Sequence, residues 1–392
     1  MEDPNENITD YDYEFEFDDY NQHIIVAIAF IIASVLGIFG NSLVILSVFA
    51  SNKLRTVTNA FVVNLSVADL VTSLLIPWNA LILLSHEVHP IADWGCAVAA
   101  GVLFTCVGCS LFTLASIAVN RLLLITRPIG ASRALSPVFT GIWIAATWVL
   151  SFLFNIVPPL VGIGELGTSQ KYRVCAAKSS HPLKDYYDYI QAVGCFPIPL
   201  LTLTICYIVI FLHLRQHSRK LSQHDFRQTS SHGSDTLTTS SADDNAATLP
   251  TNNNGNPGGT VTDTSSVRNS RDSRVIRRSR RHNQSRRNSV SEISLRRREH
   301  RITKNMFIVF LAFFICIIPF ALTLVISDGA PLVPYATALI LMNACINPIL
   351  YGFKHPTFKR VFKCLLTCRW HRVPEPSSAF KWWRSCFCSN RK

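Results

Sequence analysis

The chain has few charged residues for its length. Of its 392 residues, 16% are charged and 49% are hydrophobic, a balance that is unusual for a soluble protein of this size. The hydrophobic residues gather in runs of about twenty or more, the length of a membrane span. A soluble multidomain enzyme would have shorter runs with helix or strand periodicity. The scarcity of charge therefore predicts a membrane protein.

Other features that the sequence lacks narrow its function. It has no internal repeats, which many transporters have, and neither the charge ring nor the filter loop of a channel. Asp69 is the one ionisable residue well inside the predicted membrane region. Without a histidine or second carboxylate at that depth, we expect no enzyme activity. A transporter stays as a remote alternative.

Windows of about twenty apolar residues predict seven membrane-spanning helices. They cover residues 24–49, 58–84, 97–125, 137–161, 189–214, 302–326 and 332–353. We therefore expect an all-α membrane protein, a bundle of seven transmembrane helices.

Lys and Arg are absent from the first 52 residues, which contain nine Asp or Glu. Fourteen Lys or Arg lie in residues 268–304, and the loops at 51–57 and 126–136 are also basic. By the positive-inside rule, the N-terminus is extracellular and the C-terminus cytoplasmic, although the loop 162–188 departs with four basic residues. We expect a multi-pass plasma-membrane protein whose first span acts as the insertion signal, without a cleavable signal peptide.

The polar segments predict three parts: an acidic extracellular tail, 1–22; a membrane domain, 23–367; and a cytoplasmic tail, 368–392. Asn7 begins a glycosylation sequon in the first tail. The tyrosines among its acids are compatible with sulfation and with a basic ligand, and a solvated disordered tail is the alternative. Residues 216–298 predict a disordered third cytoplasmic loop, in which Ser289 follows two arginines as in a basophilic kinase site. Anionic lipid explains its basic residues better than nucleic acid does.

Residues 353–366 predict a short amphipathic cytoplasmic helix on the inner leaflet. It has four apolar residues on one face and three basic residues on the other: Phe358, Val361, Phe362 and Leu365, against Lys359, Arg360 and Lys363. Cys364 and Cys368 near its end are either palmitoylation sites or buried free thiols.

Two predicted spans carry notable polar residues. From Cys96 to Arg121 the third span covers about 37 Å as a helix, slightly more than the hydrocarbon core. It would therefore place a cysteine at one membrane face and an arginine at the other. Asp69 in the second span is a functional candidate, because a carboxylate at membrane depth is costly unless it is hydrated, paired or protonated. A structural carboxylate held by amides is the alternative.

Each predicted span also carries a distinctive group. In chain order these are Gly40-Asn41, Leu65 to Asp69, Cys96 with Arg121, Trp148, Pro199 with Tyr207, Phe313 with Pro319, and Asn347-Pro348-Ile349-Leu350-Tyr351. This pattern resembles the rhodopsin-like (class A) G-protein-coupled receptors over residues 24–367. The resemblance leaves out both tails and the long third loop.

The resemblance implies a disulfide between Cys96 and Cys175. It implies a sodium site, with Na⁺ as an allosteric ion and no other cofactor, made by Asp69, Ser110, Asn343 and Asn347, whose oxygens suit a hard cation. It also implies an activation switch formed by Asn120, Arg121, Tyr207, Glu299, Phe313, Pro319, Pro348 and Tyr351. The implied partners are an extracellular ligand, a heterotrimeric G protein, arrestin, receptor kinases and membrane lipid.

The sequence departs from the family pattern at two positions of the switch. Asn120 stands where the family usually has an acidic residue, and an amide cannot pair ionically with Arg121. We expect raised basal signalling, because the loss of this ion pair changes the resting equilibrium by about 1 kcal/mol. We expect Glu299 to moderate this effect. Ile317 replaces a common tryptophan, so the sixth helix would couple to ligand through other groups, such as Phe313.

By position in the family, the pocket is lined by Trp78, Asn79, Leu103, Phe104, Val107, Asn155, Gln191, Leu322 and Tyr335. Packing between helices is the alternative role for several of them. Because Leu103 replaces the aspartate of amine receptors, a protonated monoamine is disfavoured. The apolar, amide-containing lining favours a neutral or lipid-like ligand, and a peptide that binds the acidic tail is the alternative. The asparagine–arginine pair further resembles the melatonin receptors and related glial-type orphan receptors, although Pro348 is atypical of melatonin receptors.

Overall fold

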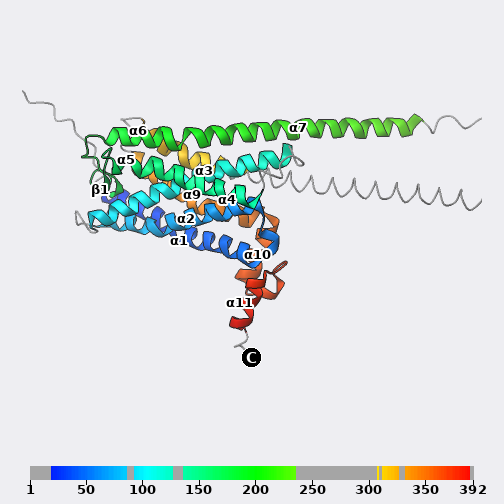
Figure 1. The fold of residues 1–392 in the computed structure, drawn as a ribbon, viewed down its shortest axis with the longest axis horizontal. Helices are drawn as coiled ribbons and strands as arrows, with labels where there is room; N and C mark the ends of the chain where they lie inside the picture. Colours follow the sequence, from blue (N-terminus) through cyan, green and yellow to red (C-terminus); the bar gives the residue numbers. More distant parts are fainter. Residues whose placement is uncertain are drawn as a thin grey trace, which may run out of the picture. The chain divides into compact units, whose positions relative to one another are not determined.

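The structure is a computed structural model that describes residues 19–85, 92–126, 136–234, 307–308, 311–325 and 332–388. The backbone alone is described for residues 217–234 and 387–388. The chain divides into two units, residues 1–211 with 302–392 and residues 212–301. The first unit holds a helix bundle, and the described residues of the second, 212–234, belong to a helix that begins in the first (Figure 1).

The described residues are mainly helical (Figure 1). The long helices are α1 (Tyr20–Ala50), α2 (Val57–Leu84), α3 (Asp93–Thr126), α4 (Pro137–Asn155), α6 (Lys184–Cys195), α7 (Pro197–Ser234) and α9 (Val333–Lys354). With α6 and the start of α7 taken together, six helical segments are long and apolar enough to span a membrane. A shorter apolar helix, Leu311–Thr323, lies within the sixth predicted span, part of which falls outside the described residues. The predicted all-α architecture is therefore confirmed.

The fourth predicted span extends too far, because α4 ends at Asn155 rather than at residue 161. Pro159 has no N–H to donate to the carbonyl of Asn155, which the hydroxyl of Tyr187 satisfies instead at 3.0 Å. A separate turn of helix, α5 (Val157–Leu160), follows. The fifth predicted span is similarly divided into α6 and α7, with Phe196 between them and Pro197 starting the second helix.

The loop 162–188 contains a β-hairpin that the sequence analysis did not predict. Strands β1 (Leu166–Ser169) and β2 (Val174–Ala177) are antiparallel, with Thr168 opposite Cys175. Both strands pack against α3, and β2 also packs against α2. The hairpin therefore covers the end of the bundle at which α3 begins.

Small residues bring α1 close to its neighbours α2 and α9. A Cβ atom on Gly40 would lie 2.7 Å from the Cβ of Pro348, so no larger side chain fits there. The opposite side of α1 is apolar and uncovered, with Ile25, Val35 and Phe39 between 58% and 61% exposed. An apolar outer surface on a helix of this length is typical of a membrane span.

After α9 the chain forms three short helices, α10 (Pro356–Leu366), η3 (Trp370–Arg372) and α11 (Ser378–Cys388). Phe358, Val361 and Phe362 of α10 are buried, whereas its basic residues are exposed. The predicted amphipathic helix is therefore confirmed. Helix α11 was not predicted, and it packs near the end of α1 (Figure 1).

Candidate functional site

Asp69 of α2 lies at a junction of three helices and is 2% exposed. Its Oδ1 atom accepts a hydrogen bond from Ser110 of α3 at 2.8 Å, and its Oδ2 atom accepts one from Asn347 of α9 at 3.0 Å. A buried carboxylate is costly unless its oxygens are satisfied, so these bonds favour one arrangement of α2, α3 and α9. The structure thus brings together three of the four residues predicted for the sodium site.

The fourth residue, Asn343, lies one helical turn before Asn347 on α9 and is 6% exposed. The side-chain oxygens of both asparagines are buried and accept no hydrogen bond from the described residues. Buried acceptors are normally satisfied, so this pair of oxygens leaves coordination capacity beside Asp69. One carboxylate, one hydroxyl and two amide oxygens are a suitable donor set for a hard cation such as Na⁺.

Two other buried amides connect helices around this junction. Asn41 of α1 donates to the carbonyl of Ala344 on α9 at 2.8 Å. Asn64 of α2 donates to the hydroxyl of Thr113 on α3 at 2.8 Å and accepts from the indole of Trp148 on α4 at 2.9 Å. Asn41 of the first span and Trp148 of the fourth are therefore contacts between helices.

At the far end of α3, Asn120 and Arg121 are both buried, at 2% and 7% exposed. The side-chain oxygen of Asn120 accepts a hydrogen bond from the hydroxyl of Thr58 in the first turn of α2, at 2.8 Å. Asn120 thus holds the ends of α2 and α3 together. Sequence reasoning missed Thr58, because a single hydroxyl at the start of a predicted span is a weak signal.

Two tyrosines of the predicted switch are also buried, Tyr207 at 7% and Tyr351 at 2% exposed. The ring of Tyr351 stacks on Phe358 of α10, with centroids 5.8 Å apart, and Tyr207 packs edge-on against Phe307 at 5.7 Å. Helix α10 is therefore in direct contact with the switch tyrosine of α9. Glu299 lies outside the described residues.

In the helix Leu311–Thr323, Phe313 and Ile317 are each 1% exposed, one turn apart. Pro319 is partly buried in the same helix. Ile317 therefore belongs to the buried face of this helix, where an aliphatic side chain occupies the position that a tryptophan commonly fills in the family.

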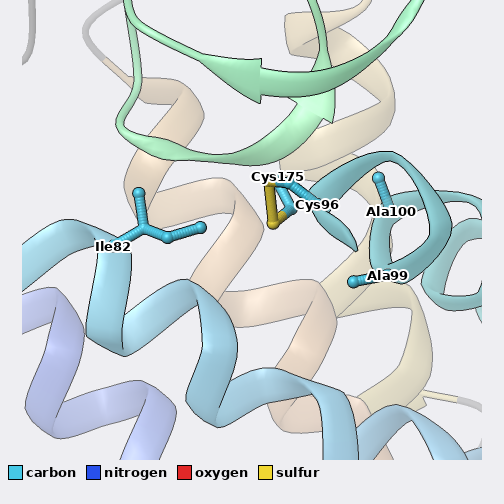
Figure 2. Packing of buried hydrophobic residues seen from close by; sticks show 5 residues of the cluster. All are labelled: Ile82, Cys96, Ala99, Ala100 and Cys175. Carbon is cyan, nitrogen blue, oxygen red and sulfur yellow. A yellow bond between two sulfur atoms is a disulfide. The ribbon is translucent and has the colours of Figure 1, made fainter. Parts of the chain in front are cut away.

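At the opposite end of α3, a disulfide joins Cys96 to Cys175 of strand β2, with Cα atoms 5.1 Å apart (Figure 2). Ile82 of α2 and Ala99 and Ala100 of α3 pack around it (Figure 2). Asn79 of α2, which is 4% exposed, accepts a hydrogen bond from the backbone N–H of Cys175 at 2.8 Å. The hairpin is thus held to α3 by a covalent bond and to α2 by a hydrogen bond.

A second polar contact attaches the other strand of the hairpin. Asp93, the first residue of α3, accepts from the backbone N–H of Thr168 at 2.9 Å and pairs with Lys178 at 2.7 Å. Lys178 also donates to Glu165 at 2.6 Å. The hydrogen bonds that Lys178 donates to Asp93 and then to Glu165 raise the pKa of its ammonium above its ordinary value, so it stays charged at neutral pH.

Two of the amides predicted for the pocket bond to each other. The side-chain nitrogen of Gln191 on α6 donates to the side-chain oxygen of Asn155 on α4 at 2.9 Å and to the hydroxyl of Tyr187 at 2.9 Å. All three residues are at least 95% buried. The group fixes the end of α4 to α6, and Tyr187 is a member that the sequence analysis did not name.

The remaining residues predicted for the pocket differ in exposure. Leu103 is buried, and Phe104 and Val107, on the same helix, are partly buried. The exposed residues are Trp78 at 42%, Leu322 at 51% and Tyr335 at 37%, and the hydroxyl of Tyr335 donates to Gln22 of α1 at 2.8 Å.

The predicted modification sites also differ in accessibility. Cys364 is 9% exposed, and its thiol donates to the carbonyl of Arg372 at 3.4 Å. Cys368 is exposed. Asn7 and Ser289 lie outside the described residues.

Comparison with known proteins identifies the family. The family model "7 transmembrane receptor (rhodopsin family)" matches residues 40–351. The chain belongs to this family. The predicted resemblance to rhodopsin-like receptors is therefore confirmed, as is the prediction that the protein is not an enzyme, and this rhodopsin-family receptor is a multi-pass membrane protein.

The receptor is similar to several characterised relatives. It is 26% identical over 371 residues to the Drosophila melanogaster protein "G-protein coupled receptor moody", a match that covers 91% of this chain and 54% of the relative. It is 26% identical over 347 residues to the Homo sapiens 5-hydroxytryptamine receptor 1F, covering 84% of this chain and 89% of the relative. The crystal structure of squid rhodopsin matches with a TM-score of 0.64 at 20% identity, covering 91% of this chain and 89% of that one.

The receptor spans about half the length of the first curated relatives that it matches, among them the moody receptor. The likeness to squid rhodopsin supports the fold, since both chains are covered almost completely. None of these matches assigns a ligand to this receptor.

Proposed function

We propose that the protein is a plasma-membrane G-protein-coupled receptor, with its N-terminus outside, that converts binding of an extracellular ligand into activation of a heterotrimeric G protein. The observation that carries this proposal is the junction at Asp69, which links α2, α3 and α9 between the disulfide at one end of α3 and Arg121 at the other. A buried polar junction of this kind has few satisfied arrangements, which suits a two-state switch. Arrestin and receptor kinases are the further partners expected of such a receptor.

A ligand shifts such a switch only as far as it prefers one of its two states. The hairpin and the start of α3 move as one body, because the Cys96–Cys175 disulfide and the Asp93–Thr168 hydrogen bond join them. A ligand that displaces this body therefore acts on the same helix that holds Ser110 and Arg121. The opposite end of α3 changes its contacts with Thr58 of α2 in response.

A sodium ion fits the junction as an allosteric ligand. Asp69, Ser110, Asn343 and Asn347 would hold it, with the two buried amide oxygens, which accept no hydrogen bond from the described part of the chain, as coordinating groups. When bound, the ion supplies a positive charge that stabilises the ionised form of Asp69. By linkage it stabilises whichever helix arrangement keeps these four residues together.

We assign the ligand to the class of neutral or lipid-like small molecules. Asp93 is the only carboxylate of α3, and Lys178 and the Thr168 N–H already occupy it. An ammonium ligand therefore finds no free carboxylate on this helix, which distinguishes the receptor from amine receptors despite its similarity to the 5-hydroxytryptamine receptor 1F. The placement near melatonin and glial-type orphan receptors rests on Asn120 and Arg121 alone and stays a prediction.

A guanine-nucleotide exchange assay tests the main proposal. The receptor is expressed in membranes with heterotrimeric G proteins, and exchange is compared with that of Arg121→Gln at equal surface expression. Exchange that rises with the receptor and falls to the background in the variant is expected. Solute flux without any effect on exchange would show that the protein is a transporter.

A peptide ligand is the alternative, because the first 22 residues are acidic. Deletion of residues 1–22 distinguishes the two ligand classes once a screen has found an agonist. A small molecule that binds among the helices keeps its potency on the truncated receptor. Loss of the response, with surface expression unchanged, would favour a peptide.

A further inference from the structure

The segment after α10 is attached to the end of α1. The backbone N–H of Ser377 donates to the carbonyl of Ala50, and the N–H of Asn52 donates to the carbonyl of Glu375, both at 2.9 Å. The hydroxyl of Ser377 donates to the carbonyl of Phe49 at 2.7 Å. The last carbonyls of a helix have no hydrogen-bond donor within that helix. Ser377 therefore donates to two of the terminal carbonyls of α1, those of Phe49 and Ala50.

An aromatic cluster between α11 and η3 strengthens this attachment. Phe380 is fully buried, and its ring stacks with Trp383 at a centroid distance of 5.8 Å. Trp383 in turn packs against Trp370 of η3 at 5.2 Å. Burial of aromatic rings is the dominant packing contribution available to such a short segment, so α11 is held on one side by this cluster.

Helix α11 has apolar residues on an exposed face as well as on its buried side. At 100° per residue, Ala379, Trp382 and Cys386 lie on one exposed face, beside the buried Phe380. Trp382 is 69% exposed, although tryptophan is among the most costly side chains to leave in water. The exposed polar residues Lys381 and Ser385 lie on another face.

The position of this face relates it to the membrane. Helix α11 is attached where the apolar sequence of α1 gives way to Ser51, Asn52 and Lys53, which is where a membrane span ends. Figure 1 shows α11 next to α10 at that end of α1. Tryptophan is enriched at this level of a bilayer, where its ring is apolar and its N–H remains hydrated.

The charge of the segment complements anionic lipid. Residues 369–388 contain four Lys or Arg and one Glu. Lys381 is exposed on α11, and α10 adds the exposed Lys359, Arg360 and Lys363 nearby. Each basic residue close to a negatively charged membrane surface contributes to binding, and an adjacent aromatic residue inserts between the headgroups.

We propose that the exposed face of α11, formed by Ala379, Trp382 and Cys386, binds the anionic lipid surface of the bilayer at the end of the bundle where α1 ends. The main-chain contacts of Ser377 set the depth of the helix, Trp382 inserts among the headgroups, and Lys381, which is exposed beside Trp382, contacts lipid phosphates. The receptor thus has a second interfacial helix that continues the surface of α10.

Photo-crosslinking of the full-length receptor tests this proposal. A photoreactive phenylalanine replaces Trp382, and the receptor is placed in nanodiscs of phosphatidylcholine with or without phosphatidylserine. Mass spectrometry then measures lipid adducts at this position. We expect abundant adducts with phosphatidylserine present, and a decrease of about fivefold in lipid binding when one charge is removed by Lys381→Gln.

The matched control places the photoreactive residue at Arg384, which is partly buried and lies about 160° from Trp382 around the same helix. Fewer lipid adducts at residue 384 than at 382 support the proposal. Equal yields at the two positions, or yields that do not depend on phosphatidylserine, would overturn it. A protein adduct at residue 382 in native membranes would also overturn it, by showing that this face binds a protein.

Discussion

The change Asn120→Asp tests whether the missing carboxylate raises the basal activity of the receptor. In the structure the side-chain oxygen of Asn120 accepts a hydrogen bond from Thr58 at 2.8 Å, and the residue is 2% exposed. Aspartate has nearly the same shape and keeps an oxygen for Thr58. The substitution therefore adds one negative charge beside Arg121 and leaves the packing of α2 on α3 unchanged.

The added charge stabilises the state in which Arg121 lies beside residue 120. We expect the pairing of the new carboxylate with Arg121 to contribute about 1 kcal/mol, which is about fivefold in the ratio of two states. A carboxylate this deeply buried has to be paired, because an unpaired charge costs far more. We therefore expect basal nucleotide exchange of Asn120→Asp to be about fivefold lower than that of the wild type.

Basal exchange is measured without ligand on receptors in nanodiscs, with purified heterotrimeric G protein and a fluorescent guanine nucleotide. Thr58→Val is the control, since it removes the hydroxyl donor but adds no charge. This control should lower thermal stability by about 1 kcal/mol without the fall in basal exchange. Equal basal exchange in the wild type and Asn120→Asp would refute the reasoning, and so would an equal decrease in Thr58→Val.

Three further predictions concern the junction, the hairpin and the tail. Asp69→Asn removes the charge that attracts sodium, so NaCl should no longer raise the melting temperature of the variant above that in KCl. For the wild type, the stabilisation by sodium is about 2.7 kcal/mol when the sodium concentration is about a hundredfold above the dissociation constant. Equal salt responses of the wild type and the variant would contradict the sodium site. Asn79→Ala leaves the N–H of Cys175 buried without its acceptor and should cost about 1–3 kcal/mol in thermal unfolding, whereas Leu81→Ala, at an exposed residue of the same helix, should cost less. Phe380→Ala removes a fully buried ring and should accelerate maleimide labelling of Cys364, which peptide mass spectrometry measures. Trp382→Ala, at an exposed residue, should not accelerate this labelling.

Much of the bundle was predictable because its signals are local. A run of about twenty apolar residues has to be helical in lipid, since every backbone polar group needs a partner within the segment. The polar groups inside such runs, Asp69 and Asn347 among them, were identified for the same reason: a polar side chain at that depth requires a partner. The family resemblance grouped Asp69 with Ser110 and Asn347, and the structure shows that Ser110 bonds to one oxygen of Asp69 and Asn347 to the other.

The unpredicted features depend on contacts between residues that are distant in the sequence. Tyr187 lies in a loop by sequence, but it satisfies the carbonyl that Pro159 leaves open at Asn155. The hairpin has strands of four residues, which are too short for a periodic signal, and it is held by α2 and α3. Helix α11 depends on its attachment to α1, more than 320 residues earlier in the chain.

The amino-acid pattern alone is enough to predict a bundle of membrane-spanning helices, with a carboxylate inside the membrane and an arginine at one end of the third span. Hydrophobicity over twenty residues is a property of a single segment, so no tertiary information is needed to detect it. The bond between Asn120 and Thr58, the bond between Asn155 and Gln191, and the return of the chain after α10 to α1 are visible only in the folded structure. A hydrogen bond between segments depends on the relative position of two helices, and that position results from the packing of the whole bundle.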